Sequence, residues 1–215
     1  MDLEKNYERL IELVDFHLPD RAEVIKQMYE ELNERIMLAP ASSVDYFHNA
    51  FPGGYLDHIL RVTDNAVALY ESFENLYGLS TEGFDLSNVV FVGLHHDLGK
   101  LGFPHENGEV YLPNKSEWHR KNLGKVYEYN KDIPFALTPD LSLFLLQYYN
   151  VPVNWTEFQA IKIHDGLYDE TNKPYYISRT EASKLRSNLP YLIHMADFLA
   201  ARKEYETWKK EQEGK

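Results

Sequence analysis

The feature that most constrains this chain is the spacing of its apolar side chains, which recur every three or four residues along nearly its whole length. Such spacing puts side chains on one face of an α-helix, because the helix completes a turn every 3.6 residues. The clearest row consists of Tyr55, Ile59, Val62, Ala66, Leu69 and Phe73. The sequence therefore predicts an all-α fold, a bundle of about eight helices.

Capping and turn residues divide this pattern into segments, since Asp or Ser is typical of a helix start and glycine of a helix end. We expect the helix with the apolar body 89–94 to be buried on all sides and to end at Gly99. Residues 101–114 contain Asn107-Gly108, which favours a small loop or hairpin. The other helices are expected at 2–17, 19–37, 55–78, 114–130, from 139 onward, at 154–164, and from 189 past 205.

Length and composition favour one domain. The chain has 215 residues, and at about 150 residues per domain the simplest arrangement is a single unit, 1–215. Residues 1–38 form an amphipathic helical hairpin that we expect to pack on the rest, with a role in a homodimer as the alternative. Cysteine is absent, which excludes disulfides and thiolate chemistry, so any metal must be held by His, Asp or Glu.

The charge balance is acidic, with 22 Lys+Arg against 34 Asp+Glu and a formal net charge of −12. Long nucleic acids are not expected as partners, because their binding depends on dense basic patches. A small anion stays compatible, since a few cations or a metal reverse the field inside one pocket. The longest apolar run, 89–94, is far shorter than the ~20 residues of a membrane-spanning helix, and the N-terminus lacks signal-peptide features. We therefore expect a cytoplasmic protein with no membrane partner.

The candidate chemistry lies on histidines and aspartates beside the apolar rows. His58 and His164 lie on or beside such rows, His96-Asp97 comes at the end of the buried helix, and Asp197 lies on the inner edge of the last helix. A single inward histidine is more often a hydrogen-bonded core residue than a ligand. Buried carboxylates, however, are costly unless they are paired or bind a metal, so two of them beside several imidazoles favour a shared cation. The free carbonyls of a helix end would add to this preference.

Three segments combine glycine, histidine and aspartate in a fixed order: Pro52-Gly53-Gly54-Tyr55-Leu56-Asp57-His58, Leu94-His95-His96-Asp97-Leu98-Gly99-Lys100 and His194-Met195-Ala196-Asp197. Together they resemble the HD superfamily of metal-dependent phosphohydrolases. The resemblance covers about residues 45–205 and implies an all-helical core in which His58, His96, Asp97 and Asp197 bind a divalent metal. Members with a second metal have two further histidines. His119 and His164 match these, the latter within Ile163-His164-Asp165-Gly166.

The resemblance also implies hydrolysis of a phosphoester of a nucleotide or a related small phosphorylated molecule. One or two divalent ions (Mn, Fe, Co, Ni, Zn or Mg), held with Asp97, would activate a water molecule. Lys100 is expected to hold a phosphate, and His95 or His164 to protonate the leaving oxygen. Further candidates for substrate binding are Arg61, Lys173, Arg179 and Arg202. Each of these cations has a structural alternative, as an ion-pair partner, a helix-terminal charge or a surface residue.

Three other functions stay open. A di-iron oxygenase resembling myo-inositol oxygenase uses six ligands in the same order, which here are His58, His96, Asp97, His119, His164 and Asp197. A short-RNA 3'-5' exonuclease shares the Gly-Gly-x-x-x-His segment, although the missing basic patch disfavours it. A non-catalytic sensor would bind a ligand at the same site without turnover.

Overall fold

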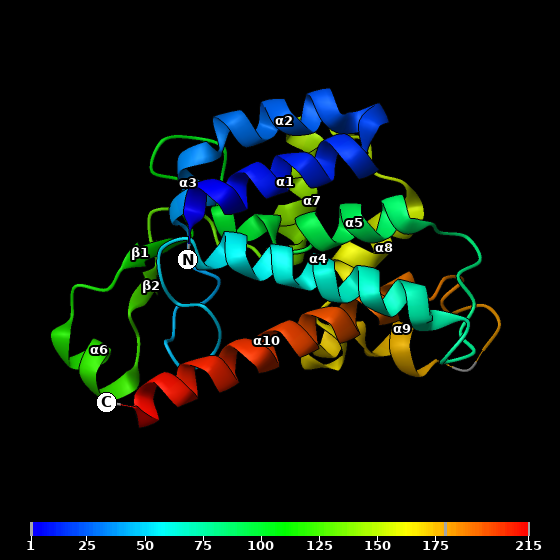
Figure 1. The fold of residues 1–215 in the computed structure, drawn as a ribbon. Coiled ribbons are helices and arrows are strands. Elements are labelled where there is room, and N and C mark those ends of the chain that lie inside the picture. The colour runs from blue at the N-terminus through cyan, green and yellow to red at the C-terminus, as the bar shows by residue number, and fades with distance from the viewer. Residues whose placement is uncertain (1, 179, 215) are drawn as a thin grey trace.

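The computed structural model describes residues 2–178 and 180–214, and its regular structure is almost entirely helical (Figure 1), which confirms the all-α class. Its α-helices are α1 (Leu3–His17), α2 (Ala22–Glu31), α3 (Asn33–Leu38), α4 (Gly54–Phe73), α5 (Leu86–His95), α6 (Glu117–Leu123), α7 (Thr138–Tyr148), α8 (Trp155–Lys162), α9 (Lys173–Ile177) and α10 (Leu189–Glu213). They are accompanied by the 3₁₀ helices η1 (Pro19–Arg21), η2 (Leu98–Leu101), η3 (Gly166–Tyr168) and η4 (Glu170–Asn172), and by the strands β1 (Tyr111–Pro113) and β2 (Tyr127–Tyr129).

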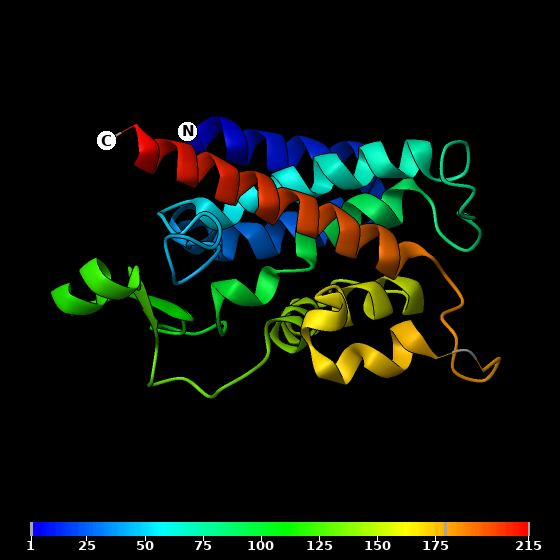
Figure 2. The ribbon, with the colours of Figure 1, turned by 90° about the horizontal axis from the view of Figure 1, so that it is seen from below.

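Helix α4 is the centre of the fold, packing along α5 and along α10 (Figures 1 and 2). Its predicted apolar row is buried except for the half-buried Leu69. The body of α5, residues 89–94, is buried on every side as its sequence predicts. Helix α1 contacts both α4 and α5, and Figure 2 shows α7, α8 and α9 in a layer on the other side of α10.

The N-terminal segment lies on this core. The helix expected over 19–37 is divided into η1, α2 and α3, with the second break at Leu32, where the backbone leaves helical geometry. Leu32 is itself buried, and the break lets α3 pack on α4 with Ile36 inside. Although residues 19–37 favour one helix locally, the chain breaks at Leu32 so that both helical pieces contact the core.

Helix α5 ends at His95, earlier than the Gly99 expected from the sequence, and the chain continues into η2. Gly99 serves close packing instead. A Cβ at this position would lie 2.3 Å from Thr138 O and 2.9 Å from Ser142 N, so only glycine lets η2 approach α7 this closely. Ser142 Oγ accepts a hydrogen bond from Gly99 N at 2.8 Å and lies 2.9 Å from His96 O, which provides polar partners where α5 ends.

Of the small loop or hairpin expected within 101–114, the structure has the loop. Asn107-Gly108 makes a tight turn, in which Asn107 has a left-handed backbone, but β1 pairs antiparallel with the later strand β2. Helix α6 lies between β1 and β2 in the chain, and it projects at one end of the molecule (Figures 1 and 2). The helix expected to reach residue 130 stops at Leu123, because Gly124 adopts the left-handed C-cap conformation.

The structure shows which side chains cap the N-termini of α6 and α8. Helix α6, expected from residue 114, begins at Glu117, where Ser116 caps it by accepting a hydrogen bond from His119 N, while Asn154 and Glu157 form a capping box at α8. None of the helices within residues 2–178 and 180–214 combines the length and apolar character needed to cross a bilayer.

Candidate metal centre

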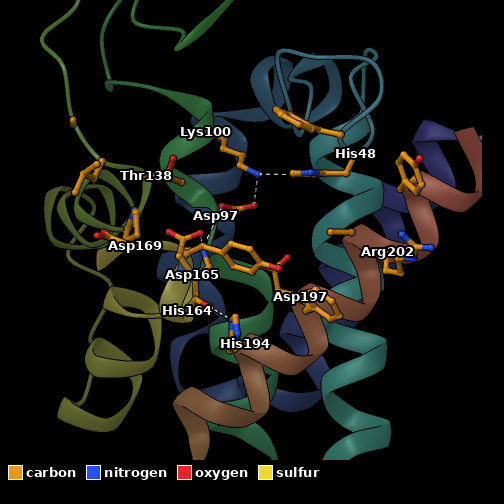
Figure 3. Close-up of a pocket in the computed structure, with 18 of the residues that line it drawn as sticks. His48, Asp97, Lys100, Thr138, His164, Asp165, Asp169, His194, Asp197 and Arg202 are labelled. Carbon is orange, nitrogen blue, oxygen red and sulfur yellow. Dashed lines mark hydrogen bonds and ion pairs between the residues drawn. The ribbon is translucent and has the colours of Figure 1, made fainter. Parts of the chain in front are cut away.

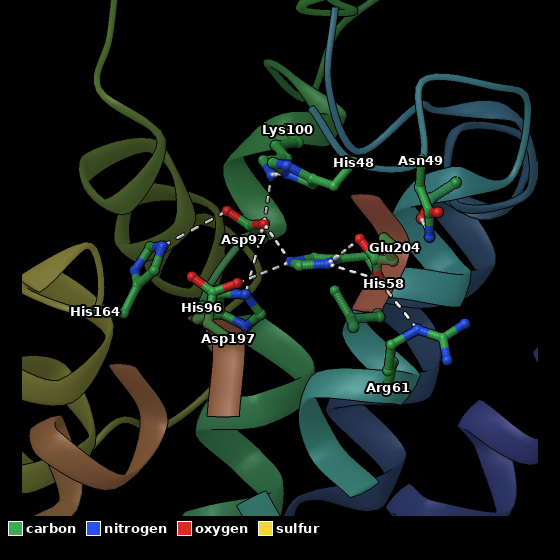
Figure 4. A network of polar contacts seen from close by, with 12 residues as sticks. His48, Asn49, His58, Arg61, His96, Asp97, Lys100, His164, Asp197 and Glu204 are labelled. Atoms are coloured by element: carbon green, nitrogen blue, oxygen red, sulfur yellow. Dashed lines mark hydrogen bonds and ion pairs between the residues drawn. The ribbon is translucent and has the colours of Figure 1, made fainter. Parts of the chain in front are cut away.

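Four of the six predicted metal ligands form one connected cluster (Figure 4), in which His58, His96 and Asp197 make one close group and His96, Asp97 and the neighbouring His164 a second that shares His96. His58 comes from α4, His96 and Asp97 from the turn that follows α5, and Asp197 from α10. His58 Nε2 lies 3.3 Å from Asp97 Oδ2 and 3.2 Å from Asp197 Oδ1, and His96 Nε2 lies 3.5 Å from Asp97 Oδ2. The site therefore joins the three central helices of the fold.

These distances fit one bound cation. Donor atoms that bind a single ion at ~2.0–2.2 Å with tetrahedral or octahedral angles lie roughly 3–3.5 Å apart. The three measured separations fall in this range, from 3.2 to 3.5 Å. Imidazole and carboxylate together form a donor set for Mn, Fe, Co, Ni or Zn. Within each close group, His58-His96-Asp197 or His96-Asp97-His164, the ligand atoms lie within 4.8 Å of one another.

Hydrogen bonds orient the two imidazoles. His96 Nδ1 donates to Gly93 O at 2.9 Å, and His58 Nδ1 donates to the Glu204 carboxylate, with both oxygens at 3.2 Å. Both Nε2 atoms are buried and form no hydrogen bond within the described residues. Buried polar atoms without a partner are rare in folded proteins, and a metal ion is one of the partners that can explain them.

The electrostatics of the cluster require a positive charge. Although burial raises the carboxyl pKa of Asp97, Lys100 and His96 outweigh it and hold that pKa well below its usual range. Burial likewise lowers the pKa of His58, but Glu204, Asp197 and Asp97 raise it well above its usual value. Without a metal, a proton on His58 therefore supplies the charge that two ionised aspartates demand.

His164 lies beside the cluster on the side of Asp97 that faces away from His58. It is 2% exposed, its Nδ1 donates to Ile161 O at 2.8 Å, and its Nε2 lies 3.6 Å from Asp97 Oδ1. Burial lowers the pKa of His164, but the neighbouring Asp97, Asp165 and Asp197 raise it to about 9. His164 can thus act as an additional ligand or as a proton donor.

His119, the sixth predicted ligand, is not brought to the cluster. It is exposed on α6, where its ring contacts that of Trp118. The physical reason is that α6 belongs to the connection between β1 and β2, which projects away from the site (Figure 1). Five of the six predicted ligands therefore gather at the site.

A cavity of about 770 Å³ opens above the cluster (Figure 3). Asp97, His164 and Asp197 lie at its base. Its aromatic lining consists of Tyr46, Phe47, Tyr129, Phe135, Tyr168, Phe198 and Tyr205. This volume is within the range of ~300–1,000 Å³ that is typical of small-molecule sites.

Lys100 projects into this cavity from η2. Its Nζ lies 2.6 Å from Asp97 Oδ2 and 3.3 Å from His48 Nε2. Burial together with Lys100 and His58 lowers the pKa of His48 to about 3, so neutral His48 accepts the hydrogen bond from Lys100. An ammonium group has three donors, and two are used here, which leaves one for a bound anion.

Two predicted residues lie behind the cluster or away from it. His95 is fully buried on the opposite side of α5, within 2.9 Å of the Tyr29 hydroxyl and 2.7 Å of Phe91 O. Burial lowers the His95 pKa to about 3, so it is a neutral core residue with no access to the cavity. Arg61 pairs with Asp57 at 2.8 Å and with Glu204 at 3.2 Å.

The remaining predicted cations differ in their placement. Arg202 lines the cavity and also pairs with Glu206. Lys173 pairs with Glu170 at 2.7 Å and does not line the cavity. Arg179 lies outside the described residues.

Three residues at the site were not predicted as site residues: Glu204 behind His58, His48 beside Lys100, and His194, whose Nδ1 donates to His164 O at 2.8 Å. Glu204 follows Asp197 by seven residues, two turns of α10, so the helical spacing could have indicated it. No spacing indicates His48, because it lies in the loop before α4.

Comparisons with known proteins add no relative: no protein-family model, no curated protein and no solved structure matches the chain. The site must therefore be interpreted from its own chemistry.

Proposed function

We propose that this protein is a metal-dependent phosphohydrolase of the HD type, which cleaves a phosphoester of a nucleotide or a related small phosphorylated molecule. The observation that carries the proposal is the convergence of His58, His96, Asp97 and Asp197 at the base of the cavity, with two buried Nε2 atoms that form no hydrogen bond within the described residues. The resemblance of the three sequence segments to that superfamily points in the same direction.

A divalent ion held there would lower the pKa of bound water from ~15.7 to ~7 and polarise a phosphoryl oxygen. The chain's own residues supply the rest. Lys100, fixed between Asp97 and His48, offers its third donor to a phosphoryl oxygen. His164 is the candidate for protonating the leaving oxygen, because it lines the cavity while His95 does not.

The charges of the cavity also support a metal. Among the described residues that line it, Asp97, Asp165, Asp169 and Asp197 outnumber the cations, which are Lys100, Arg202 and, when no metal is bound, the protonated His164. A phosphate would be repelled from such a surface unless an added cation reversed the local field. Since His119 is distant, we propose one principal ion, with His164 as a catalytic group.

This arrangement favours hydrolysis over the di-iron oxygenase, which needs six ligands where five are gathered here. A short-RNA exonuclease is disfavoured by the four carboxylates of the cavity, which would repel successive phosphates. A sensor would use the same residues, so only turnover separates it from an enzyme.

The test is hydrolysis of a panel of nucleotides, cyclic nucleotides and dinucleotides by protein stripped with chelator and reloaded with Mn, Co, Fe, Zn or Mg. We expect turnover that requires metal and falls at least about 1,000-fold in Asp97→Ala and Asp197→Asn. His119→Ala is the matched control, since it removes a histidine outside the cluster, and it should keep activity. Tight nucleotide binding without product, or turnover unchanged in folded Asp97→Ala, would contradict the proposal.

A further inference from the structure

The cavity above the metal centre has two chemically different sides (Figure 3). Lys100 brings positive charge to the part beside Asp97 and His48, whereas Arg202 lies apart on α10 and is paired with Glu206. Asp165, Asp169 and His194 line another part, which is built by the segment after α8 and the first turns of α10. The two sides therefore suit different parts of a ligand.

His194 is held in one orientation. Its Nδ1 donates to His164 O at 2.8 Å, and its ring lies directly over Gly166. A Cβ at Gly166, whose backbone is left-handed, would lie 2.3 Å from Cε1 and 2.5 Å from Nε2 of the ring. The rings of Tyr168 and Tyr176 approach it edge-on. With its proton on Nδ1, His194 presents Nε2 as an acceptor, and this atom forms no hydrogen bond within the described residues.

The two carboxylates beside it also keep free acceptor capacity. The side chain of Asp165 is 44% exposed, and its one ion-pair contact among the described residues is His164 Nε2 at 3.7 Å. Asp169 uses Oδ1 to accept from the Thr171 backbone and hydroxyl, which leaves Oδ2 for another donor. An ionised carboxylate accepts hydrogen bonds and cannot donate them.

We propose that Asp165, Asp169 and His194 form an acceptor wall that selects phosphoesters whose alcohol portion carries hydroxyl donors, as the ribose of a ribonucleotide does. The inference rests on the proposed function and specifies its substrate class. The phosphate is repelled by the carboxylates and attracted by Lys100 and the metal centre, so the sugar hydroxyls face the wall. The aromatic lining provides the surface on which a base can stack.

The acceptor wall should discriminate against substrates that lack the sugar hydroxyls, and deoxy analogues test this preference. An analogue without the hydroxyls leaves the acceptors without donors after they have lost water, and a hydrogen bond to a charged acceptor is worth about 10- to 100-fold in binding. We therefore expect a ribonucleotide to exceed its 2',3'-dideoxy analogue by about this factor in kcat/KM.

The experiment measures that ratio in the metal-loaded protein, in Asp165→Asn, in His194→Gln and in the surface control Asp64→Asn. The ratio within each variant cancels a general loss of activity. We expect it to fall in Asp165→Asn, where a charged acceptor becomes a neutral amide, and in His194→Gln, which lacks the ring held by His164 O and Gly166, and to stay at the wild-type value in Asp64→Asn. Calorimetric titration with the uncleavable phosphonate analogues of the same pair gives the corresponding ratio of Kd values without turnover.

Bis(p-nitrophenyl) phosphate has no hydroxyl donor, so its hydrolysis tests the proposed function independently of the acceptor wall. If the protein hydrolyses it but treats ribo and dideoxy substrates alike, or if both variants keep the wild-type ratio, the acceptor wall is overturned and the proposed function stands. If no phosphoester is hydrolysed under any metal, the proposed function fails and this inference fails with it.

Discussion

Asp97 is the residue on which the site depends most. Its Oδ2 atom lies within 3.5 Å of His58, His96 and Lys100, and its Oδ1 atom lies 3.6 Å from His164. One carboxylate thus connects the cation position, the phosphate-binding candidate and the proton-donor candidate. Its pKa is held well below the usual range chiefly by Lys100, so it stays ionised at neutral pH.

Glu204 should control metal affinity without being a ligand. It is buried, holds His58 through Nδ1 and is itself held by Arg61. We expect Glu204→Gln to weaken metal binding about 10- to 100-fold, as for other carboxylates that orient a metal-binding histidine. Glu211→Gln, two turns further along α10 and exposed, is the matched control. Equal affinity in both variants, measured by calorimetry, would contradict this role.

Metal binding should release protons. The pKa values of His58 and His164 are raised, the latter to about 9, so both imidazoles carry a proton at pH 7 when no metal is bound. A metal binds the neutral imidazole, so affinity should rise as the pH increases and each bound histidine loses its proton. We expect about one proton released at pH 7 if only His58 coordinates, and about two if His164 also does.

Calorimetry in buffers of different ionisation enthalpy measures this release directly. An affinity that does not change between about pH 6 and pH 8, with no proton released, would show that these imidazoles do not face the ion.

At this scale the sequence predicted which side chains gather in the cluster better than it predicted their surroundings. His58, His96, Asp97 and Asp197 could be found because each lies on or beside a buried helical row. His119 was misjudged as a ligand by chain order alone, since its place depends on where α6 lies. The role of His48 depends on how a loop approaches Lys100, which no local pattern encodes.

Among the elements, the contact between η2 and α7 holds the turn that carries His96 and Asp97. Gly99 permits this contact, because a Cβ there would collide with the backbone of Thr138 and Ser142. We expect Gly99→Ala to destabilise the fold by about 1–3 kcal/mol and to weaken metal binding by displacing Asp97 and Lys100. Urea unfolding and metal titration measure the two effects.

Gly214→Ala is the control for this substitution, because among the described residues the nearest atom to a Cβ at that position is Lys210 O, at 3.6 Å. Its free energy of unfolding should change by less than about 0.5 kcal/mol. If Gly99→Ala is equally silent, the close approach of η2 and α7 does not position the site.

Helix existence was easier to predict than helix limits. Long amphipathic rows of side chains predicted α1, α4 and α10. The break at Leu32 and the pairing of β1 with β2 were not predicted, because they depend on contacts between distant segments. Gly99 was expected to end α5 because glycine commonly ends helices. Its actual function is to permit packing, which sequence alone cannot distinguish.

For the whole molecule, the metal should act as a cross-link between α4, α5 and α10, since its ligands come from all three. A ligand that binds only the folded chain at about 100 times its Kd stabilises it by about 2.7 kcal/mol. For about 200 residues this corresponds to a rise in Tm of about 5–10 °C. We expect chelator to lower the Tm by this amount and re-addition of the metal to restore it. An unchanged Tm would argue against a bound ion in the core.

The central claim is that His58, His96, Asp97 and Asp197 bind one divalent ion. Its most direct test is the titration of chelator-treated protein with Mn²⁺, following free and bound ion by electron paramagnetic resonance. We predict one tightly bound ion per chain in the wild type and in His119→Ala, and loss of that ion in Asp97→Asn and Asp197→Asn. A wild-type protein that binds no Mn²⁺, or aspartate variants that bind it as tightly as the wild type, would contradict the account.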